Sequence, residues 1–243
     1  MKIDKAIILA AGQGKRLFPY TKDRPKCLLD FGGRSLIEIQ LAAFESCGIK
    51  DVTVVVGYKS ERVMETLGEK VKYVKNEHYE DTSSMYSLWL ARENGYQGCV
   101  VLNSDVLFHP NILRKLLVCE SPNALAMDFH AHLNEEEMKV RVEGKRVKGL
   151  SKAFREADGE NVGMLKFDSA GWGLLVGTIE EFLGKGHLKE MVPFAVDAIA
   201  SKCFIEAVSV NRLPWIEIDF PEDYEKALKE IYPPIESYLF HHA

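Results

Sequence analysis

The feature that most constrains the fold is an alternation of short apolar runs with amphipathic segments over roughly the first half of the chain. The apolar runs lie at residues 5–10, 52–57, 71–75 and 99–103, and such runs are typical of strands covered on both faces. Between them, Ser35 is a candidate helix N-cap, Gly48 a candidate left-handed C-terminal residue, and Ser83 or Ser84 a second helix start. This order implies right-handed crossovers, so we predict an α/β fold with a Rossmann-like, mostly parallel mixed sheet flanked by helices.

The pattern changes after about residue 123. Segments 138–142 and 146–150 flank a glycine-containing turn and predict a hairpin. We further expect a strand at 162–167, a helix at 188–201, a strand from Phe204 into 214–219, and a last helix over 221–231 that Pro233-Pro234 ends. The sequence contains no linker or repeat, so we expect one domain over residues 1–243, in which 123–243 extends the sheet begun by 1–122.

Composition excludes several classes of protein. The chain has 243 residues, and no apolar run approaches the roughly 18 residues of a membrane span, so we expect no membrane insertion. The five cysteines form no CxxC pair and favour neither a disulfide framework nor a zinc site; we expect a cytoplasmic protein. The net charge of −5 argues against a nucleic-acid partner. Any anionic ligand therefore requires a local basic site.

The loop after the first predicted strand supplies such a site. Gly12 and Gly14 allow a sharp turn in which several backbone N–H groups point into one concavity, a geometry that binds phosphate. Lys15, Arg16 and Lys26 add positive charge, and the proline before Lys26 restricts the approach of the chain. The loop lacks the third glycine of the dinucleotide fingerprint, and the chain lacks a P-loop. We therefore predict a nucleotide site of another kind.

Residues 9–38, LAAGQGKRLFPYTKDRPKCLLDFGGRSLIE, match the pattern LAAGxGxRLxPxTxxxPKxLLxxxGxxLIE nearly throughout. The stretch resembles the nucleotidyltransferases that join a nucleoside triphosphate to a phosphorylated sugar or alcohol and release pyrophosphate. The resemblance implies that the loop wraps the triphosphate and that Arg16 and Lys26 hold phosphate oxygens, with the backbone near the start of the loop contacting the base. The nucleotide contacts so implied in this stretch are Leu9, Ala10, Ala11, Gly12, Gly14, Lys15, Arg16 and Lys26.

The same resemblance implies a magnesium site. Asp105 follows the fourth predicted strand at the position of a metal ligand that also meets the nucleotide, and Asp219 stands at that of its partner. Two carboxylates suffice, because Mg²⁺ keeps phosphate and water as its other ligands. We expect Glu217 to be a bystander, and we assign no role to the histidines, since an attacking phosphate needs no general base. Arg16, Lys26, Asp105 and Asp219 are thus the expected catalytic residues.

Segment 76–88 narrows the subfamily. It resembles the NxxYxxTNNxxSL segment of cytidylyltransferases that activate phosphocholine and related phospho-alcohols, with Ser83 and Ser84 in place of the two asparagines. The resemblance favours CTP and implies that Asn76, Ser83 and Ser84 contact the nucleotide. From the residues alone, Ser83 is equally well explained as a helix N-cap.

The second half resembles the acceptor-binding half of the same cytidylyltransferases. That likeness implies that Lys152 holds the acceptor phosphate, Glu160 binds its head group and Lys139 supports them. For Lys139 an exposed position on a hairpin is nearly as good an explanation. Aromatic residues are candidates for a cage around a quaternary ammonium, although core positions explain most of them equally well. The aromatic candidates are Tyr86, Trp89, Phe154, Trp172 and Trp215, of which we name Tyr86, Trp172 and Trp215 as acceptor contacts.

These inferences lead to one expected function and two alternatives. We expect transfer of a nucleotidyl group from CTP to a phosphorylated small alcohol such as phosphocholine, or to 2-aminoethylphosphonate. The alternatives are a sugar-1-phosphate uridylyl- or thymidylyltransferase and a catalytically silent nucleotide-binding subunit. The apolar C-terminal residues Ile235, Tyr238, Leu239 and Phe240 would cover either a core edge or a second subunit, so a homodimer stays open.

Overall fold

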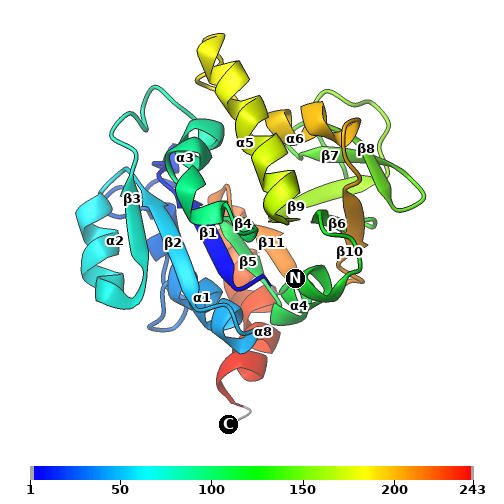
Figure 1. Cartoon of the computed structure of the whole chain (residues 1–243). Helices are drawn as coiled ribbons and strands as arrows, with labels where there is room; N and C mark the ends of the chain where they lie inside the picture. The colour runs from blue at the N-terminus through cyan, green and yellow to red at the C-terminus, as the bar shows by residue number, and fades with distance from the viewer. Residues whose placement is uncertain (1–2, 242–243) are drawn as a thin grey trace.

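The fold is built on a nine-stranded mixed sheet, which a computed structural model describes within residues 3–241 (Figure 1). The strand order is β3-β2-β1-β4-β9-β6-β10-β8-β7. Strands of both chain halves join this one sheet, as the sequence predicts. The strands are β1 (Lys5–Ala10), β2 (Asp51–Val56), β3 (Lys72–Lys75), β4 (Cys99–Asn103), β6 (Ala124–Asp128), β7 (Lys139–Glu143), β8 (Arg146–Ser151), β9 (Gly159–Phe167) and β10 (Glu206–Ser209).

The first half of the sheet is parallel and the second is largely antiparallel. β1 pairs in parallel with β2 and with β4, and β2 with β3. β9 then lies antiparallel between β4 and β6, and β7 and β8 form the predicted hairpin. The strands expected at 5–10 and 99–103 have the predicted bounds, whereas β9 begins at Gly159, three residues before the predicted start.

Helices cover both faces of the sheet, and alternate residues of β1 pack against them. Ile8 joins a core with α1 (Leu36–Ser46), α2 (Ser60–Leu67) and α4 (Pro110–Val118). Ile7 and Leu9 join the opposite core with α3 (Ser84–Leu90), α5 (Ser169–Gly184) and α6 (Val192–Ala200). Because burial on both faces removes polar residues from a strand, this arrangement explains the near-continuous apolar run of β1. Ser35 is the N-cap of α1, as predicted.

A two-stranded sheet lies beside the large one. It pairs β5 (Val106–Phe108) with β11 (Trp215–Glu217). The prediction of one strand from Phe204 into 214–219 is therefore wrong. Asn211 and Arg212 adopt positive φ values of 51° and 59°, and a strand cannot continue through such residues. The chain leaves the large sheet after β10 and pairs with β5 instead.

The C-terminal region is helical beyond the predicted end. α7 (Pro221–Lys226) is followed by a π-helical turn (Ala227–Ile231) and α8 (Tyr232–Phe240). The prediction that Pro233-Pro234 ends the helix is wrong, because both prolines lie in the first turn of α8, where their missing N–H groups are not needed. Ile235 packs with Phe31 and Leu107 in a third core cluster.

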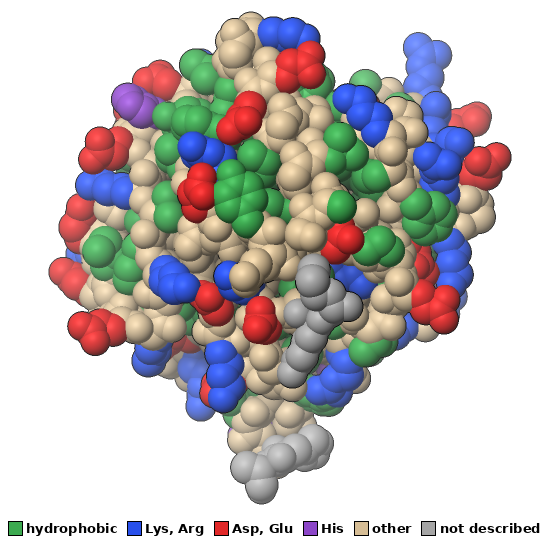
Figure 2. Space-filling model, viewed as in Figure 1, with side chains coloured by type: hydrophobic (Ala, Val, Ile, Leu, Met, Phe, Trp, Pro, Cys, Tyr) green, Lys and Arg blue, Asp and Glu red, His purple; other side chains and the backbone are tan. Residues whose placement is uncertain are grey.

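The visible face of the molecule carries acidic and basic side chains interspersed with apolar ones (Figure 2). Among residues 3–241, no helix has the length and apolar character needed to cross a membrane.

Candidate active site

A cavity of about 520 Å³ lies where the carboxyl ends of β1 and β4 meet the strands of the second half. The loop after β1 contributes Gly12 and Gly14, and the turn after β4 contributes Asp105. Glu217 and Asp219 enter from β11 and the residues just after it. Ligands of open α/β sheets collect at this edge, so the cavity is the candidate active site.

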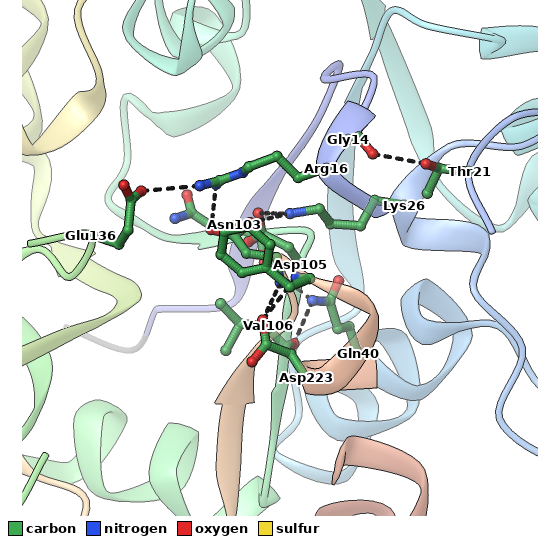
Figure 3. Close-up of polar contacts among 12 residues, drawn as sticks. Gly14, Arg16, Thr21, Lys26, Gln40, Asn103, Asp105, Val106, Glu136 and Asp223 are labelled. Carbon is green, nitrogen blue, oxygen red and sulfur yellow. Dashed lines mark hydrogen bonds and ion pairs between the residues drawn. The ribbon is translucent and has the colours of Figure 1, made fainter. Parts of the chain in front are cut away.

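The glycine loop packs closely against Lys26. Gly14 has φ +65°, and a Cβ there would lie 3.3 Å from Cβ and 3.4 Å from Cε of Lys26. The carbonyl oxygen of Gly14 accepts a hydrogen bond from Thr21 Oγ1 at 2.7 Å (Figure 3). Glycine is therefore required at position 14 both by the backbone conformation and by the close approach of the lysine.

Lys26 and Arg16 meet carboxylates at the centre of the cavity. Lys26 Nζ lies 2.5 Å from Asp219 Oδ1 and 3.1 Å from Asp105 Oδ2. Arg16 Nη2 lies 2.5 Å from Asp219 Oδ2. Its Nη1 lies 3.0 Å from Glu136 Oε2 (Figure 3). Burial disfavours the charged lysine, but the two aspartates outweigh it and raise the pKa of Lys26 above 10.5.

Three carboxylates gather around this lysine. Asp105, Glu217 and Asp219 each offer an oxygen, and these oxygens lie within 4.8 Å of one another. Burial raises the pKa of Asp219, but the charges of Lys26 and Arg16 outweigh it and bring that pKa below 3.8. Burial, with the charges of both aspartates, raises the pKa of Glu217 to about 8. An all-oxygen set of this kind suits a hard divalent cation. Glu217, expected to be a bystander, thus lies with the two aspartates.

Backbone and amide contacts fix the two aspartates in place. Gln40 Nε2 donates to the carbonyl oxygens of Asn103 and Val106, on either side of the turn that carries Asp105. The N–H groups of Asp219 and Phe220 donate to the carboxylate of Asp223 at 3.0 and 2.8 Å. Figure 3 shows Gln40 and Asp223 beneath the charged cluster. Asp105 Oδ1 is buried and has no hydrogen-bond partner within residues 3–241, so it is available to a ligand.

The predicted base-contacting segment forms one wall of the cavity. Asn76 is buried and donates to the hydroxyls of Thr82 and Ser87, each at 3.0 Å. Asn76 therefore holds the segment together in addition to lining the cavity. Ser83 is the N-cap of α3, yet its side chain makes no capping hydrogen bond in the described structure. Ser84 Oγ accepts from the N–H of Val192, which joins this wall to the start of α6.

The two predicted acceptor lysines differ in position: Lys152 lines the cavity and Lys139 lies outside its lining. Lys152 lines the cavity, and its Nζ lies 3.7 Å from Glu136 Oε2. Lys139 is buried, 8% exposed, and its Nζ donates to the backbone carbonyl of Lys152 at 2.8 Å. Lys139 thus supports the chain at Lys152 and is not the exposed hairpin lysine of the alternative explanation.

Glu160 belongs to a buried acidic group behind the cavity wall. It stands opposite Asp128 in the register of β9 and β6, and Asp128 Oδ2 accepts from Trp215 Nε1 at 2.9 Å. Burial, with the charges of Glu137 and Asp128, raises the pKa of Glu160 to about 8. Its neighbour Asn161 lines the cavity, but Glu160 itself does not.

The cavity collects most of the residues predicted from the sequence. Those that line it are Leu9, Ala11, Gly12, Gly14, Lys15, Arg16, Lys26, Asn76, Ser83, Ser84, Asp105, Lys152 and Asp219. Ala10, Lys139, Glu160, Tyr86, Trp172 and Trp215 lie outside the lining.

The aromatic cage is not assembled. Trp172 is 0% exposed and packs in the core against Gly95, with its Nε1 donating to the carbonyl of Arg92, so its inclusion as a ligand contact is wrong. Tyr86 packs beside Trp89, with ring centroids 5.6 Å apart. The large apolar surface of these rings explains their positions better than a cation does.

Several lining residues were not predicted. Glu136 lies in the loop before β7, and Met191 and Pro193 lie at the start of α6. The N–H of Met85 donates to the carbonyl of Glu190, which draws this segment against α3. Contacts between residues so far apart in the chain leave no local sequence pattern. For Glu136, the one available signal was its place in a run of three glutamates just before the strand that carries Lys139.

Two known proteins are similar in sequence to this chain over most of its length. The chain is 30% identical over 232 residues to the bifunctional IPC transferase and DIPP synthase of Aquifex aeolicus; the match covers 93% of this chain and 51% of that protein, so the chain spans about half of its length. It is 24% identical to the CTP:phosphoglutamine cytidylyltransferase of Campylobacter jejuni, with coverage of 93% and 99%.

A solved structure shares the fold. The CTP:phosphocholine cytidylyltransferase of Streptococcus pneumoniae superposes with a TM-score of 0.78 at 24% identity, over 94% of this chain and 98% of that one. Residues 6–140, which include the glycine loop, Lys26 and Asp105, match the model of the MobA-like NTP transferase domain. The chain therefore belongs to the MobA-like NTP transferase family.

Proposed function

We propose that the chain is a magnesium-dependent cytidylyltransferase. It transfers the cytidylyl group of CTP to a phosphorylated small alcohol such as phosphocholine, or to 2-aminoethylphosphonate, and releases pyrophosphate. The observation that carries the proposal is the meeting of Arg16 and Lys26 with three carboxylates in one cavity. The names of the Campylobacter relative and the Streptococcus structure favour CTP.

The proposed chemistry needs positioning and neutralisation of charge. A phosphate or phosphonate oxygen of the acceptor attacks the α-phosphorus in line, and pyrophosphate leaves. Arg16 and Lys26 bind the phosphate oxygens on which negative charge gathers, and the N–H groups of the glycine loop bind the triphosphate. Lys152, supported by Lys139, binds the acceptor phosphate. No side chain has to remove a proton, because the attacking group is already an anion.

The carboxylates fit a magnesium ion. Asp105 has a buried oxygen without a partner in residues 3–241, and Asp219 and Glu217 lie beside it. Mg²⁺ held there would polarise the phosphate oxygens and stabilise the pentacoordinate transition state. Asp105 and Asp219 are the proposed ligands, with Glu217 directly bound or bound through water.

Glu160, next to the lining residue Asn161, and Asp128 place acidic charge behind the cavity wall, which favours a cationic head group. Burial, with the charges of Glu137 and Asp128, raises the pKa of Glu160, and a positively charged group nearby would favour its ionised form. The acceptor is therefore proposed to carry an amine or quaternary ammonium.

The test is magnesium-dependent pyrophosphate release with CTP, UTP, dTTP, ATP or GTP against a panel of acceptors. The panel holds phosphocholine, 2-aminoethylphosphonate, phosphoethanolamine, glycerol 3-phosphate, inositol phosphate and sugar 1-phosphates. The proposal requires turnover confined to CTP with a cationic head group, lost in D105N. Turnover of UTP or dTTP with a sugar 1-phosphate would instead establish a sugar nucleotidyltransferase, and absence of turnover with every pair would favour a silent subunit.

A further inference from the structure

Lys26 occupies the space between the two aspartates proposed to hold the metal. Its Nζ lies 2.5 Å from Asp219 Oδ1 and 3.1 Å from Asp105 Oδ2, and only 12% of its side chain is exposed. An ammonium group at these distances neutralises both carboxylates in the way that a bound cation would. The ammonium group of Lys26 is therefore a counterion shared by both aspartates.

Arg16 completes the neutralisation. Its Nη2 lies 2.5 Å from Asp219 Oδ2, so both oxygens of Asp219 are engaged by basic side chains. Asp105 Oδ1 is the carboxylate oxygen of this pair left without a hydrogen bond among residues 3–241. A divalent cation approaching these aspartates would meet the charge of Lys26 at short range in a partly buried site, where solvent screens poorly.

We propose that Lys26 keeps divalent cations out of the free protein and that the metal enters only together with the triphosphate. The inference rests on the proposed function, since it requires a polyanionic substrate. Triphosphate oxygens give Lys26 and Arg16 new partners, while the metal takes their place at Asp105 and Asp219. The two exchanges must occur together, because either one alone leaves a partly buried charge without a counterion.

The proposal makes an unusual prediction: removal of a lysine creates a binding site. In K26M the carboxylates of Asp105, Glu217 and Asp219 lose their nearest counterion. The nucleotide-free variant should then bind Mn²⁺, used as a probe for Mg²⁺, about tenfold more tightly than the unchanged protein. Without Lys26, the metal no longer depends on the triphosphate for entry.

The experiment titrates nucleotide-free protein with Mn²⁺ and follows free Mn²⁺ by electron paramagnetic resonance. K22M is the matched control, because Lys22 is exposed on the same loop and its replacement changes the net charge equally. K26M should gain affinity, K22M should not, and the added D219N substitution in K26M should abolish the gain. Equal Mn²⁺ affinity of K26M and the unchanged protein would overturn the proposal. If K26M does not fold, K26Q takes its place with the same expectation.

The closing measurement separates this inference from the proposed function. Pyrophosphate release by the unchanged protein is assayed with Mn²⁺, CTP and each acceptor of the panel above, beside the titration. Turnover without a gain of Mn²⁺ affinity in K26M and K26Q would reject the role of Lys26 and leave the proposed function standing. A gain of Mn²⁺ affinity without turnover on any acceptor would establish the charge exclusion and reject the proposed function.

Discussion

The side-chain nitrogen of Gln40 lies 2.8 Å from the carbonyl oxygen of Val106, next to the turn that carries Asp105. The same nitrogen donates to the carbonyl of Asn103 at 3.1 Å, and Gln40 is 1% exposed. Helix α1 therefore holds the turn from one side, while the N–H of Ile218 donates to the backbone carbonyl of Asp105 from the other. The backbone that carries Asp105, a proposed metal ligand, is therefore fixed by contacts from two separate elements.

Replacement of Gln40 should weaken metal use specifically. Q40M keeps a similar volume but removes both hydrogen bonds, so the Asp105 turn loses its support. We expect the Mg²⁺ concentration for half-maximal turnover to rise about tenfold, while the affinity for CTP at saturating Mg²⁺ stays the same. Saturating Mg²⁺ should restore much of kcat, which general loss of structure would not allow.

T53V is a suitable control for the Gln40 experiment, since Thr53 is equally buried, 1% exposed, and lies on β2 away from the turn. Its Mg²⁺ dependence should match that of the unchanged protein. If Q40M and T53V shift the Mg²⁺ dependence alike, Gln40 contributes to stability only.

Glu160 should make the protein less stable as pH rises. Its pKa is about 8 in the folded protein, against an ordinary 4.5 in the unfolded chain. Between these values the folded state binds the extra proton, so the free energy of unfolding falls as pH rises through this window and levels off above about 8. E160Q removes this component and should be more stable than the unchanged protein near pH 9, by on the order of a few kcal/mol.

Urea unfolding at about pH 5 and about pH 9 measures the effect of E160Q. Near pH 5 the gain should largely vanish, because Glu160 is then neutral in the folded state. Glu217, whose pKa is also raised, keeps its own contribution in both proteins. E156Q, at an exposed position, is the control. An unchanged pH slope in E160Q would show that Glu160 is ionised when folded.

Asn76 should affect both stability and CTP binding, because its side chain holds the segment 76–87 together. Its side chain donates to Thr82 and Ser87, and its Oδ1 accepts from the N–H of His78 at 2.9 Å. N76A leaves buried polar groups without partners, which costs about 1–3 kcal/mol. We expect lower thermal stability together with weaker CTP binding by isothermal titration calorimetry. Loss of CTP affinity with unchanged stability would instead indicate that Asn76 acts only by direct contact with the nucleotide.

The local parts of this fold were predictable, and its long-range contacts were not. β1 and β4 were found because strands buried on both faces have uniform apolar sequences. α5 received no prediction: glycines at 171, 173, 177 and 184 lower its helix propensity, and packing of Leu175 and Ile179 in the core overrides that preference.

The residues of the candidate site divide in the same way, into those that local motifs identified and those that depend on long-range contacts. Lys26 and Asp105 were identified through a contiguous motif and a strand end, and the structure brings them together. Trp172 was misassigned, because a large aromatic ring has the same sequence signature in a core as in a binding site. Glu136 was missed because it contacts Arg16, a residue 120 positions away in the chain, and such a contact leaves no local sequence pattern.

Glu136 should oppose both substrates. Its carboxylate lies 3.0 Å from Arg16 Nη1 and 3.7 Å from Lys152 Nζ, so it engages a proposed triphosphate ligand and the proposed acceptor ligand together. Each substrate must displace it. Because all three side chains are at least 38% exposed, each ion pair is weak, and E136Q should tighten CTP and phosphocholine binding only about twofold to threefold each.

Isothermal titration calorimetry measures the affinities of E136Q for CTP and for phosphocholine, with E135Q as a control of equal charge change at an exposed neighbour. In the unchanged protein the first substrate to bind releases Glu136 and so favours the second, and this mutual gain should shrink in E136Q. If E136Q and E135Q behave alike, general charge repulsion of the anionic substrates accounts for the effect and the bridge does not persist in solution.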